Sequence, residues 1–181
     1  MKPSTRFAVG HGLVALFWAL ALSGCGGGGS SVDPTASPAQ RVAQLEASGE
    51  LPKLDRTASI AGIDANANGV RDDIEQYIEK KYTEPAQRKA AMQTARDYQQ
   101  MLLVNKSDAV AVQALIDSGA RASNCSFDVF GGLDGFQRSY QMSRELEAMT
   151  TNTKDRLTAY LDFNRAASGS ISSSPKGNVC D

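Results

Sequence analysis

The stretch 64–75, DANANGVRDDIE, gathers oxygen-bearing side chains around one tight turn. Calcium ions in proteins take about six to eight oxygen ligands from carboxylates, amides and backbone carbonyls on a flexible frame. A calcium loop supplies them from its first, third, fifth, seventh, ninth and twelfth residues, and its sixth residue, here Gly69, must turn with a positive φ. The pattern therefore predicts a Ca²⁺ site with the ligands Asp64, Asn66, Asn68, the Val70 carbonyl, Asp72 and Glu75.

The same residues match the pattern D-x-[DN]-x-[DN]-G-x₅-E in full, and the stretch resembles the calcium loop of an EF-hand. Arg71 departs from that family, because ordinary EF-hands have an aliphatic residue at this eighth position. The residues before Asp64 also do not form a convincing entering helix, so the loop is similar to the solitary EF-hand-like loops of secreted bacterial proteins. Its low ligand charge predicts weak binding, on the order of 10⁻⁴–10⁻³ M, and a structural role.

A turn followed by a helix cap is the alternative interpretation of this stretch. Asn68 and Gly69 form a good turn dipeptide, and residues 72–75, DDIE, form a capping box whose acids suit the positive end of a helix dipole. Turn and cap together account for residues 68–75 without a metal. They do not account for Asp64 and Asn66 at alternate positions, so calcium is favoured and the alternative stays open.

The first residues have the layout of a secretory signal. Lys2 and Arg6 form a basic head, and residues 7–22 form an apolar run shorter than the roughly 20 residues of a spanning helix. The closing sequence LSGC, residues 22–25, resembles the lipobox of bacterial lipoproteins. This resemblance implies cleavage before Cys25 and lipidation of its thiol and new amine. We therefore expect a signal peptide over 1–24, a lipidated cysteine and Gly/Ser tether over 25–36, and a folded domain over 37–181.

The lipoprotein resemblance also predicts where the chain lies. No Asp follows Cys25, and the sorting habit of the family then favours an outer membrane, with the domain facing the periplasm or the surface. An uncleaved anchor or an ordinary cleaved signal is the alternative. An oxidising compartment favours a disulfide between the two remaining cysteines, Cys125 and Cys180, over two free buried thiols.

Composition limits the chemistry that the mature chain can perform. His11 is the single histidine and leaves with the predicted signal, so no imidazole remains for base catalysis or zinc ligation. The mildly acidic remainder gives no electrostatic case for nucleic acid binding. We expect a non-enzymatic envelope protein with a structural role or an envelope protein partner. The alternative is a carboxylate-dependent enzyme acting on peptidoglycan or another glycan.

Several side chains could suggest catalysis or binding but have simpler interpretations. Glu145, Glu147 and Asp155 are expected to form a solvated helix face, because residues two apart on a helix point in different directions. A serine triad is excluded because Ser139 and Ser143 have no histidine partner. The glycine-rich stretch 131–135 is expected to connect two helices. The aromatic residues Tyr140, Tyr160 and Phe163 stand at helical spacing and are expected in the core rather than on a binding surface.

Helical periodicity recurs along the chain and strand-like alternation is nearly absent, which predicts an all-α bundle of about five to six helices. A capping box at Ser37 opens the first helix and Gly49 ends it; residues 51–63 are expected to be irregular. Later helices are expected after the acidic loop, over about 84–104, over about 135–149 and from Thr153 to Gly169. Between them, Ser107 caps a fourth helix that ends near Gly119, and residues 125–130 are expected to be extended.

The inward faces of these helices follow from the same periodicity. The second to fifth helices are expected to bury Ile74, Tyr77, Ile78, Ala91, Ala95, Tyr98, Leu102, Val112, Leu115, Ile116, Met142, Leu146 and Met149. The sixth helix is expected to turn Leu157, Tyr160, Leu161 and Asn164 inward.

Overall fold

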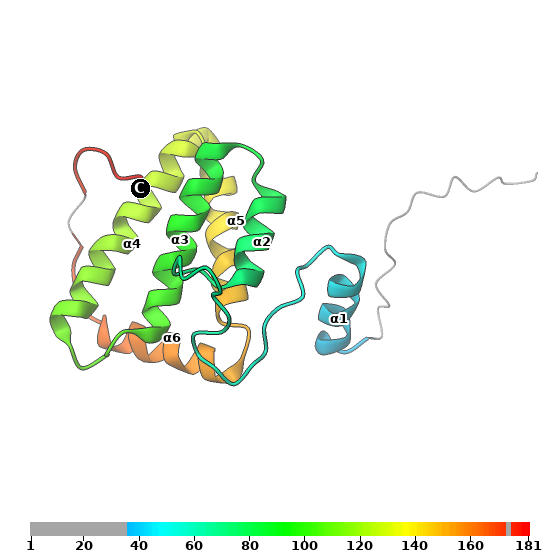
Figure 1. Cartoon of the computed structure of the whole chain (residues 1–181). Helices are drawn as coiled ribbons and strands as arrows, with labels where there is room; N and C mark the ends of the chain where they lie inside the picture. The colour runs from blue at the N-terminus through cyan, green and yellow to red at the C-terminus, as the bar shows by residue number, and fades with distance from the viewer. Residues whose placement is uncertain (1–35, 173–174) are drawn as a thin grey trace, which may run out of the picture. The chain divides into compact units, whose positions relative to one another are not determined.

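The computed structural model describes residues 36–172 and 175–181, and all regular structure within them is helical (Figure 1). The predicted signal peptide and Cys25 lie outside these residues. The elements are α1 (Pro38–Ser48), α2 (Asp72–Lys81), α3 (Pro85–Leu103), α4 (Ala109–Val129), α5 (Gly132–Thr150) and α6 (Lys154–Ala166). The prediction of an all-α bundle of five to six helices is confirmed. None of the helices in the described part of the chain is both long and apolar enough to cross a membrane.

Helix α3 is the centre of the bundle and packs against α2, α4, α5 and α6 (Figure 1). The main core lies between α2, α3 and α5 and includes Ile74, Ile78, Ala95, Met142 and Leu146. A smaller cluster of Val112, Leu115 and Phe163 joins α4 to α6. The residues predicted to face inward on the second to fifth helices are buried, which confirms that prediction. Tyr77, Tyr98 and Ile116 are only partly buried.

Helix α1 begins and ends as its sequence predicts. Ser37 accepts a hydrogen bond from the Gln40 N–H, the Gln40 side chain accepts one from the Ser37 N–H, and Gly49 closes the helix with φ 75°. None of its residues is buried. The helix therefore owes its form to local capping and not to a packed apolar face.

Helix α4 differs from the prediction in both of its ends. Its N-cap is Asp108, which accepts from the Val110 and Ala111 N–H groups, and not Ser107. The helix also continues past Gly119 to Val129, so all but the last residue of the stretch 125–130, which was expected to be extended, is helical. The reason is tertiary packing: Ala122, Cys125 and Ser126 recur at helical spacing on the face buried by the bundle. That burial outweighs the cost of one helical glycine, about 1 kcal/mol.

Helix α5 begins at Gly132, three residues earlier than expected, so most of the predicted glycine connector is helical. Gly131 supplies the left-handed N-cap with φ 103°. Gly135 is buried where α5 leaves α4, and an added Cβ there would lie 1.7 Å from the Phe130 carbonyl oxygen. Only glycine permits this close approach of the two backbone segments.

Helix α6 presents a different face to the bundle from the one predicted. Leu157 and Leu161 are 44% and 50% exposed, and Asn164 is exposed, whereas Arg156 and Phe163 are buried. The prediction was wrong because it assumed that the leucines, and not an arginine, would turn inward. Burial of the Arg156 guanidinium sets the rotation of this helix.

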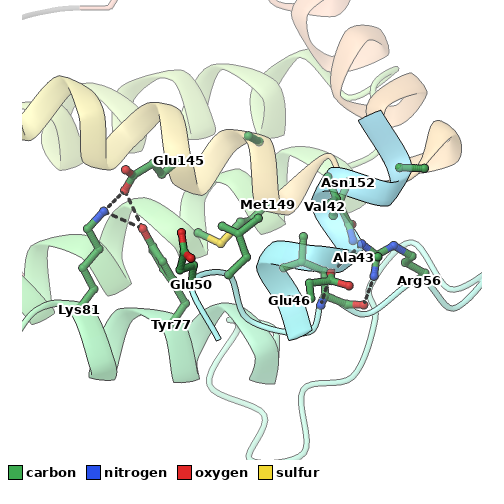
Figure 2. A pocket seen from close by; sticks show the side chains of 14 residues that line it. Val42, Ala43, Glu46, Glu50, Arg56, Tyr77, Lys81, Glu145, Met149 and Asn152 are labelled. Carbon is green, nitrogen blue, oxygen red and sulfur yellow. Dashed lines mark hydrogen bonds and ion pairs between the residues drawn. The ribbon is translucent and has the colours of Figure 1, made fainter. Parts of the chain in front are cut away.

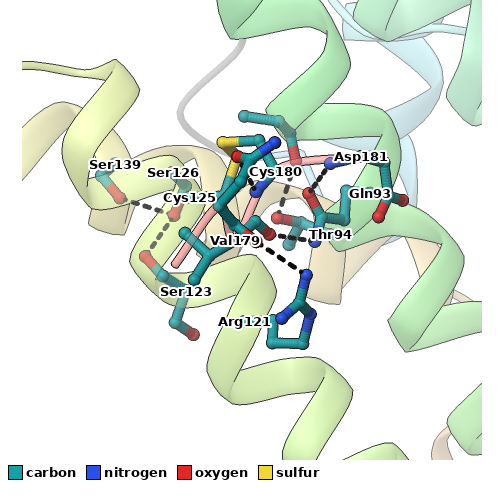
Figure 3. Close-up of a disulfide and its surroundings, with 12 residues drawn as sticks. Gln93, Thr94, Arg121, Ser123, Cys125, Ser126, Ser139, Val179, Cys180 and Asp181 are labelled. Carbon is teal, nitrogen blue, oxygen red and sulfur yellow. Dashed lines mark hydrogen bonds between the residues drawn. A yellow bond between two sulfur atoms is a disulfide. The ribbon is translucent and has the colours of Figure 1, made fainter. Parts of the chain in front are cut away.

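The predicted disulfide between Cys125 and Cys180 is confirmed (Figure 3). It holds residues 178–181 against α3 and α4, where Val179 packs on Ala90 and Cys125. Gln93 of α3 fixes the same segment through its amide, which donates to the Val179 carbonyl at 3.0 Å and accepts from the Asp181 N–H at 3.3 Å.

Candidate metal centre

The backbone of residues 64–71 turns through two left-handed positions. Gly69 has φ 83°, as the loop pattern predicts for its sixth residue, and Ala67 has φ 56°. A left-handed conformation is uncommon for a residue with a side chain. An added Cβ at Gly69 would also lie 3.1 Å from Arg96 Cγ, so both the backbone conformation and a close neighbour require glycine there.

Four of the predicted ligand residues meet at the inside of this turn. The Asp64 carboxylate accepts from the backbone N–H groups of Asn68 and Gly69 at 3.1 and 2.9 Å. Each oxygen of Glu75, in the first turn of α2, accepts from one asparagine amide: Asn66 at 2.9 Å and Asn68 at 2.8 Å. The last residue of the loop thus folds back over its third and fifth residues.

The two remaining predicted ligands lie beside this group. Asp72 accepts from the Ala65 N–H at 3.0 Å, which ties the ninth residue of the loop across to its second. The Val70 side chain is fully buried in the main core, and its N–H donates to the Asn68 side-chain oxygen. The loop is therefore closed by its own hydrogen bonds and anchored by one apolar residue.

The side chains of the loop offer oxygen donors, which hard cations prefer. The loop offers carboxylate oxygens from Asp64, Asp72 and Glu75, and rotation of the Asn66 and Asn68 amides about their last bond exchanges nitrogen for oxygen. Among the described residues, no three Asp, Glu, His or Cys side chains group closely enough to hold a metal by themselves. A cation in this loop would therefore depend on the asparagine amides and on backbone carbonyls.

The cap predicted for the alternative interpretation differs from the observed one. The N-cap of α2 is Arg71, which makes no side-chain capping bond, while Asp73 accepts from the Ile74 N–H at 2.9 Å. Asp72, Asp73 and Glu75 all lie in the first turn, where negative charge is favoured by the helix dipole. The acids therefore serve the helix start electrostatically without forming the predicted capping box.

Arg71, which departs from the EF-hand pattern, is completely buried beneath the loop. Its Nε and Nη2 donate to the two oxygens of Asp73, each at 2.7 Å, in a bidentate pair. Nη2 also donates to the Met149 carbonyl at 3.1 Å, and Nη1 to the Asn152 side chain at 3.3 Å. The eighth residue of the loop thus fastens it to the end of α5.

Arg156 is also completely buried and holds the irregular segment 51–63. Its guanidinium donates to the carbonyl oxygens of Asp55, Ser59 and Ile60, and to the Asn152 side chain. Burial and the neighbouring Arg71 charge lower the pKa of Arg156, against the opposing effect of Asp55 and Asp73. We call Arg71, Arg156, Asp55 and Asp73 the buried arginine network.

Asp55 completes this network from the irregular segment. Its carboxylate accepts from the N–H groups of Thr57 at 2.7 Å and Ile63 at 2.9 Å, and lies 3.6 Å from Arg156. Burial acts to raise its pKa, but these hydrogen bonds and the Arg156 charge outweigh it and lower the pKa to about 2. The periodicity of the sequence gave no indication of this network. The available clue was a segment without secondary structure, whose buried carbonyl groups need donors.

Arg96 of α3 connects the loop to the disulfide-bonded segment. Its Nε donates to the Asn68 carbonyl at 3.2 Å, and its Nη1 lies 2.8 Å from the Asp181 carboxylate. The loop, α3 and residues 178–181 therefore form one connected set of contacts.

The candidate acids for catalysis do not come together. Glu145 lies in a groove of about 790 Å³ between α1, α2 and α5, where Tyr77 donates to it at 2.7 Å and Lys81 pairs with it (Figure 2). Burial acts to raise its pKa, but hydrogen bonds from Lys81, Tyr77 and Gln141 lower it on balance. Glu147 pairs instead with Arg144, and Asp155 is exposed in the first turn of α6.

The three candidate aromatic residues also have separate environments. Phe163 lies in the α4–α6 cluster, and Tyr160 packs edge-to-face on Tyr98. Tyr140 is 54% exposed and stacks on Phe136. The core prediction is therefore confirmed for Phe163 and wrong for Tyr140, because Tyr140 lines an open pocket beside α3 and α4 and does not pack into the apolar core.

Comparison with known proteins finds no matching family model, no matching characterised protein and no matching solved structure. The function is therefore argued from the residues of this chain.

Proposed function

We propose that this chain is a lipid-anchored protein of the bacterial envelope whose helical domain binds one Ca²⁺ in the loop 64–75. In this proposal the ion has a structural role, and the domain serves the envelope structurally or binds a protein partner. The lipid anchor is proposed from the LSGC sequence ending at Cys25, and the Ca²⁺ site is proposed from the loop 64–75.

The observation that carries the calcium proposal is the position of Glu75. Both oxygens of this carboxylate face the amide groups of Asn66 and Asn68, so the twelfth residue of the loop is aimed at its third and fifth. A turn followed by a cap requires no such contact. A cation shared by these groups would hold the first turn of α2 to the loop and stabilise the folded state by mass action, by about 2.7 kcal/mol at a hundredfold excess over Kd.

Calorimetric titration of the full chain with CaCl₂, in a zwitterionic detergent, tests this proposal. We expect one site with Kd on the order of 10⁻⁴–10⁻³ M and a melting temperature that falls with chelator. Glu75→Gln should lose both effects because it removes the charge and the bidentate carboxylate. Glu79→Gln, one turn further along α2 on an exposed residue, is the matched control. Absence of heat and of any chelator effect in the wild type would contradict the calcium proposal and leave a turn that is closed by its own hydrogen bonds.

The anchor has a separate test. Partition of the expressed protein between detergent and aqueous phases should follow Cys25, so that the wild type enters the detergent phase and Cys25→Ser does not. Equal partition of both forms would contradict the lipoprotein proposal without affecting the calcium proposal.

The alternative of a carboxylate-dependent enzyme gains no support from Glu145. A general acid at neutral pH needs a raised pKa, whereas Lys81 and Tyr77 hold this carboxyl ionised.

A further inference from the structure

Two exposed aromatic rings lie side by side on α5. Phe136 and Tyr140, one helical turn apart, are 49% and 54% exposed, and their rings stack with centroids 6.1 Å apart and planes inclined by 18°. Large apolar side chains on a surface are informative when they are grouped and rimmed by polar residues. These two rings offer a broad apolar platform.

A pocket of about 280 Å³ opens beside this platform, between α3, α4 and α5. Its polar side-chain groups are a single amide, from Asn124, and hydroxyls from Thr94, Ser123, Ser126, Ser139, Ser143 and Tyr140. Phe127, Phe136 and Tyr140 complete the lining, and no lining residue carries a charge. The combination of neutral hydrogen-bonding groups with stacked rings distinguishes this pocket from the charged groove at Glu145.

The hydroxyl groups at the base of the pocket are ordered by hydrogen bonds. Ser139 donates to Ser126 at 3.0 Å, and Ser126 donates to the Ser123 carbonyl at 3.0 Å, so the Ser139 oxygen keeps its lone pairs as acceptors (Figure 3). Ser126 and Ser139 are 3% and 7% exposed. These two buried hydroxyls are therefore fixed in direction before any ligand arrives.

The outer polar groups of the pocket remain open to a ligand. The Ser123 hydroxyl, the Asn124 amide and the Tyr140 hydroxyl make no hydrogen bond with any described residue. Together they offer donors and acceptors on the side of the pocket that faces solvent.

We infer that this pocket binds a neutral sugar ring. A sugar ring presents an apolar C–H face that stacks on an aromatic ring, and hydroxyl groups that both donate and accept, which matches the two kinds of surface found here. The absence of charge in the lining disfavours phosphorylated or carboxylated ligands, whose charge would be left unpaired. The pocket volume of about 280 Å³ lies just below the usual range of ligand pockets, which begins at about 300 Å³, and suits one ring of a longer glycan.

This inference is independent of calcium, because none of the residues 64–75 lines the pocket. It adds a ligand class to the proposed envelope protein: an uncharged glycan is held rather than cleaved, since no lining residue is an acid.

Titration of the full chain with neutral trisaccharides of glucose, galactose, mannose and N-acetylglucosamine tests the inference. The detergent should be zwitterionic, because alkyl glycosides would compete. We expect saturation-transfer NMR and calorimetry to show binding of at least one trisaccharide, with an affinity that Tyr140→Ala lowers at least about fivefold through the lost stacking. Tyr140→Phe keeps the aromatic ring, so its affinity for the trisaccharide should fall less than that of Tyr140→Ala.

Leu157→Ala, at a similarly exposed apolar residue of α6, is the matched control and should bind as the wild type does. Lack of binding to all four trisaccharides, or equal binding by wild type and a Phe136→Ala/Tyr140→Ala variant, would overturn the inference. A concentration-dependent dimer that disappears in this double variant would also overturn it, since the rings would then serve self-association.

Discussion

Two neighbouring regions of the bundle are stabilised in different ways. Around Leu146 and Ile78, stripes of apolar side chains from α2, α3 and α5 are removed from water, and each residue finds its partners through helical periodicity. Around Arg71 and Arg156, an irregular segment is held by charge-assisted hydrogen bonds to backbone carbonyls and to Asp55 and Asp73. A segment without its own ladder of hydrogen bonds needs donors from elsewhere, and buried arginines supply several at once.

The largest expected effect comes from removing one charge of the buried arginine network. Arg71→Met should lower the free energy of unfolding by about 3–5 kcal/mol, because it leaves Asp73 without its bidentate partner in a largely buried site. Urea denaturation gives this difference. Arg56→Met is the control: its pair with Glu46 is on the surface, 46% exposed at the arginine, and should cost less than about 1 kcal/mol. Similar losses in both variants would contradict the contrast drawn between buried and exposed pairs.

Truncation of a side chain in the apolar core should have a comparable or smaller effect on stability. It should have no effect on calcium binding by the loop 64–75. Leu146→Ala removes a fully buried side chain and should cost about 3 kcal/mol through lost burial and a residual cavity. Leu133→Ala, at an 87% exposed leucine of the same helix, should change stability by less than about 0.5 kcal/mol. Calcium titration should distinguish the two variants. Arg71→Met is expected to weaken calcium binding, and Leu146→Ala is not.

A fall in pH should weaken the buried arginine network before the apolar core. The pKa of Asp55 falls from an ordinary value of 3.8 to about 2 on folding, so its contribution is fully present above pH 3.8 and is lost as the pH falls toward 2. The difference amounts to about 2 kcal/mol. Urea midpoints measured between pH 5 and pH 2 should therefore fall more steeply for the wild type than for Asp55→Asn. Parallel pH profiles would show that Asp55 is not held ionised by its neighbours.

The smallest effect is expected in α1, which buries no residue. Ser37→Ala removes the capping box and should destabilise this helix by about 1 kcal/mol. Hydrogen exchange of the α1 amides should become faster while that of the α3 amides is unchanged. A loss of protection in α3 as well would mean that α1 contributes to the bundle more than its exposure indicates.

The parts of the structure that depend on local pattern were predictable from the sequence. The apolar stripes located α2, α3 and α5, the cap at Ser37 and the glycine at Gly49 placed α1, and the spacing of the loop predicted the turn at Gly69. The disulfide between Cys125 and Cys180 followed from the predicted oxidising compartment.

The parts that depend on distant partners were not predictable in this way. Arg156 and Asp55 are 101 residues apart in sequence, and nothing near either residue indicates the other. Burial of that arginine also sets the rotation of α6, which is why Leu157 and Leu161 proved to be exposed. The extension of α4 through Cys125 likewise depends on a face supplied by neighbouring helices, and not on local propensity.

The anchoring of residues 51–63 also changes where this protein can be altered. Loops are ordinarily the places where inserted sequence is tolerated and where proteases cut first. Here the irregular segment supplies the carbonyl groups that accept hydrogen bonds from the buried Arg156, and the Gln99 side chain donates a further hydrogen bond to the Ala61 carbonyl. A tag or a permuted terminus inserted into this stretch would therefore disturb the interior of the molecule, and α1, none of whose residues is buried, is the safer point of attachment.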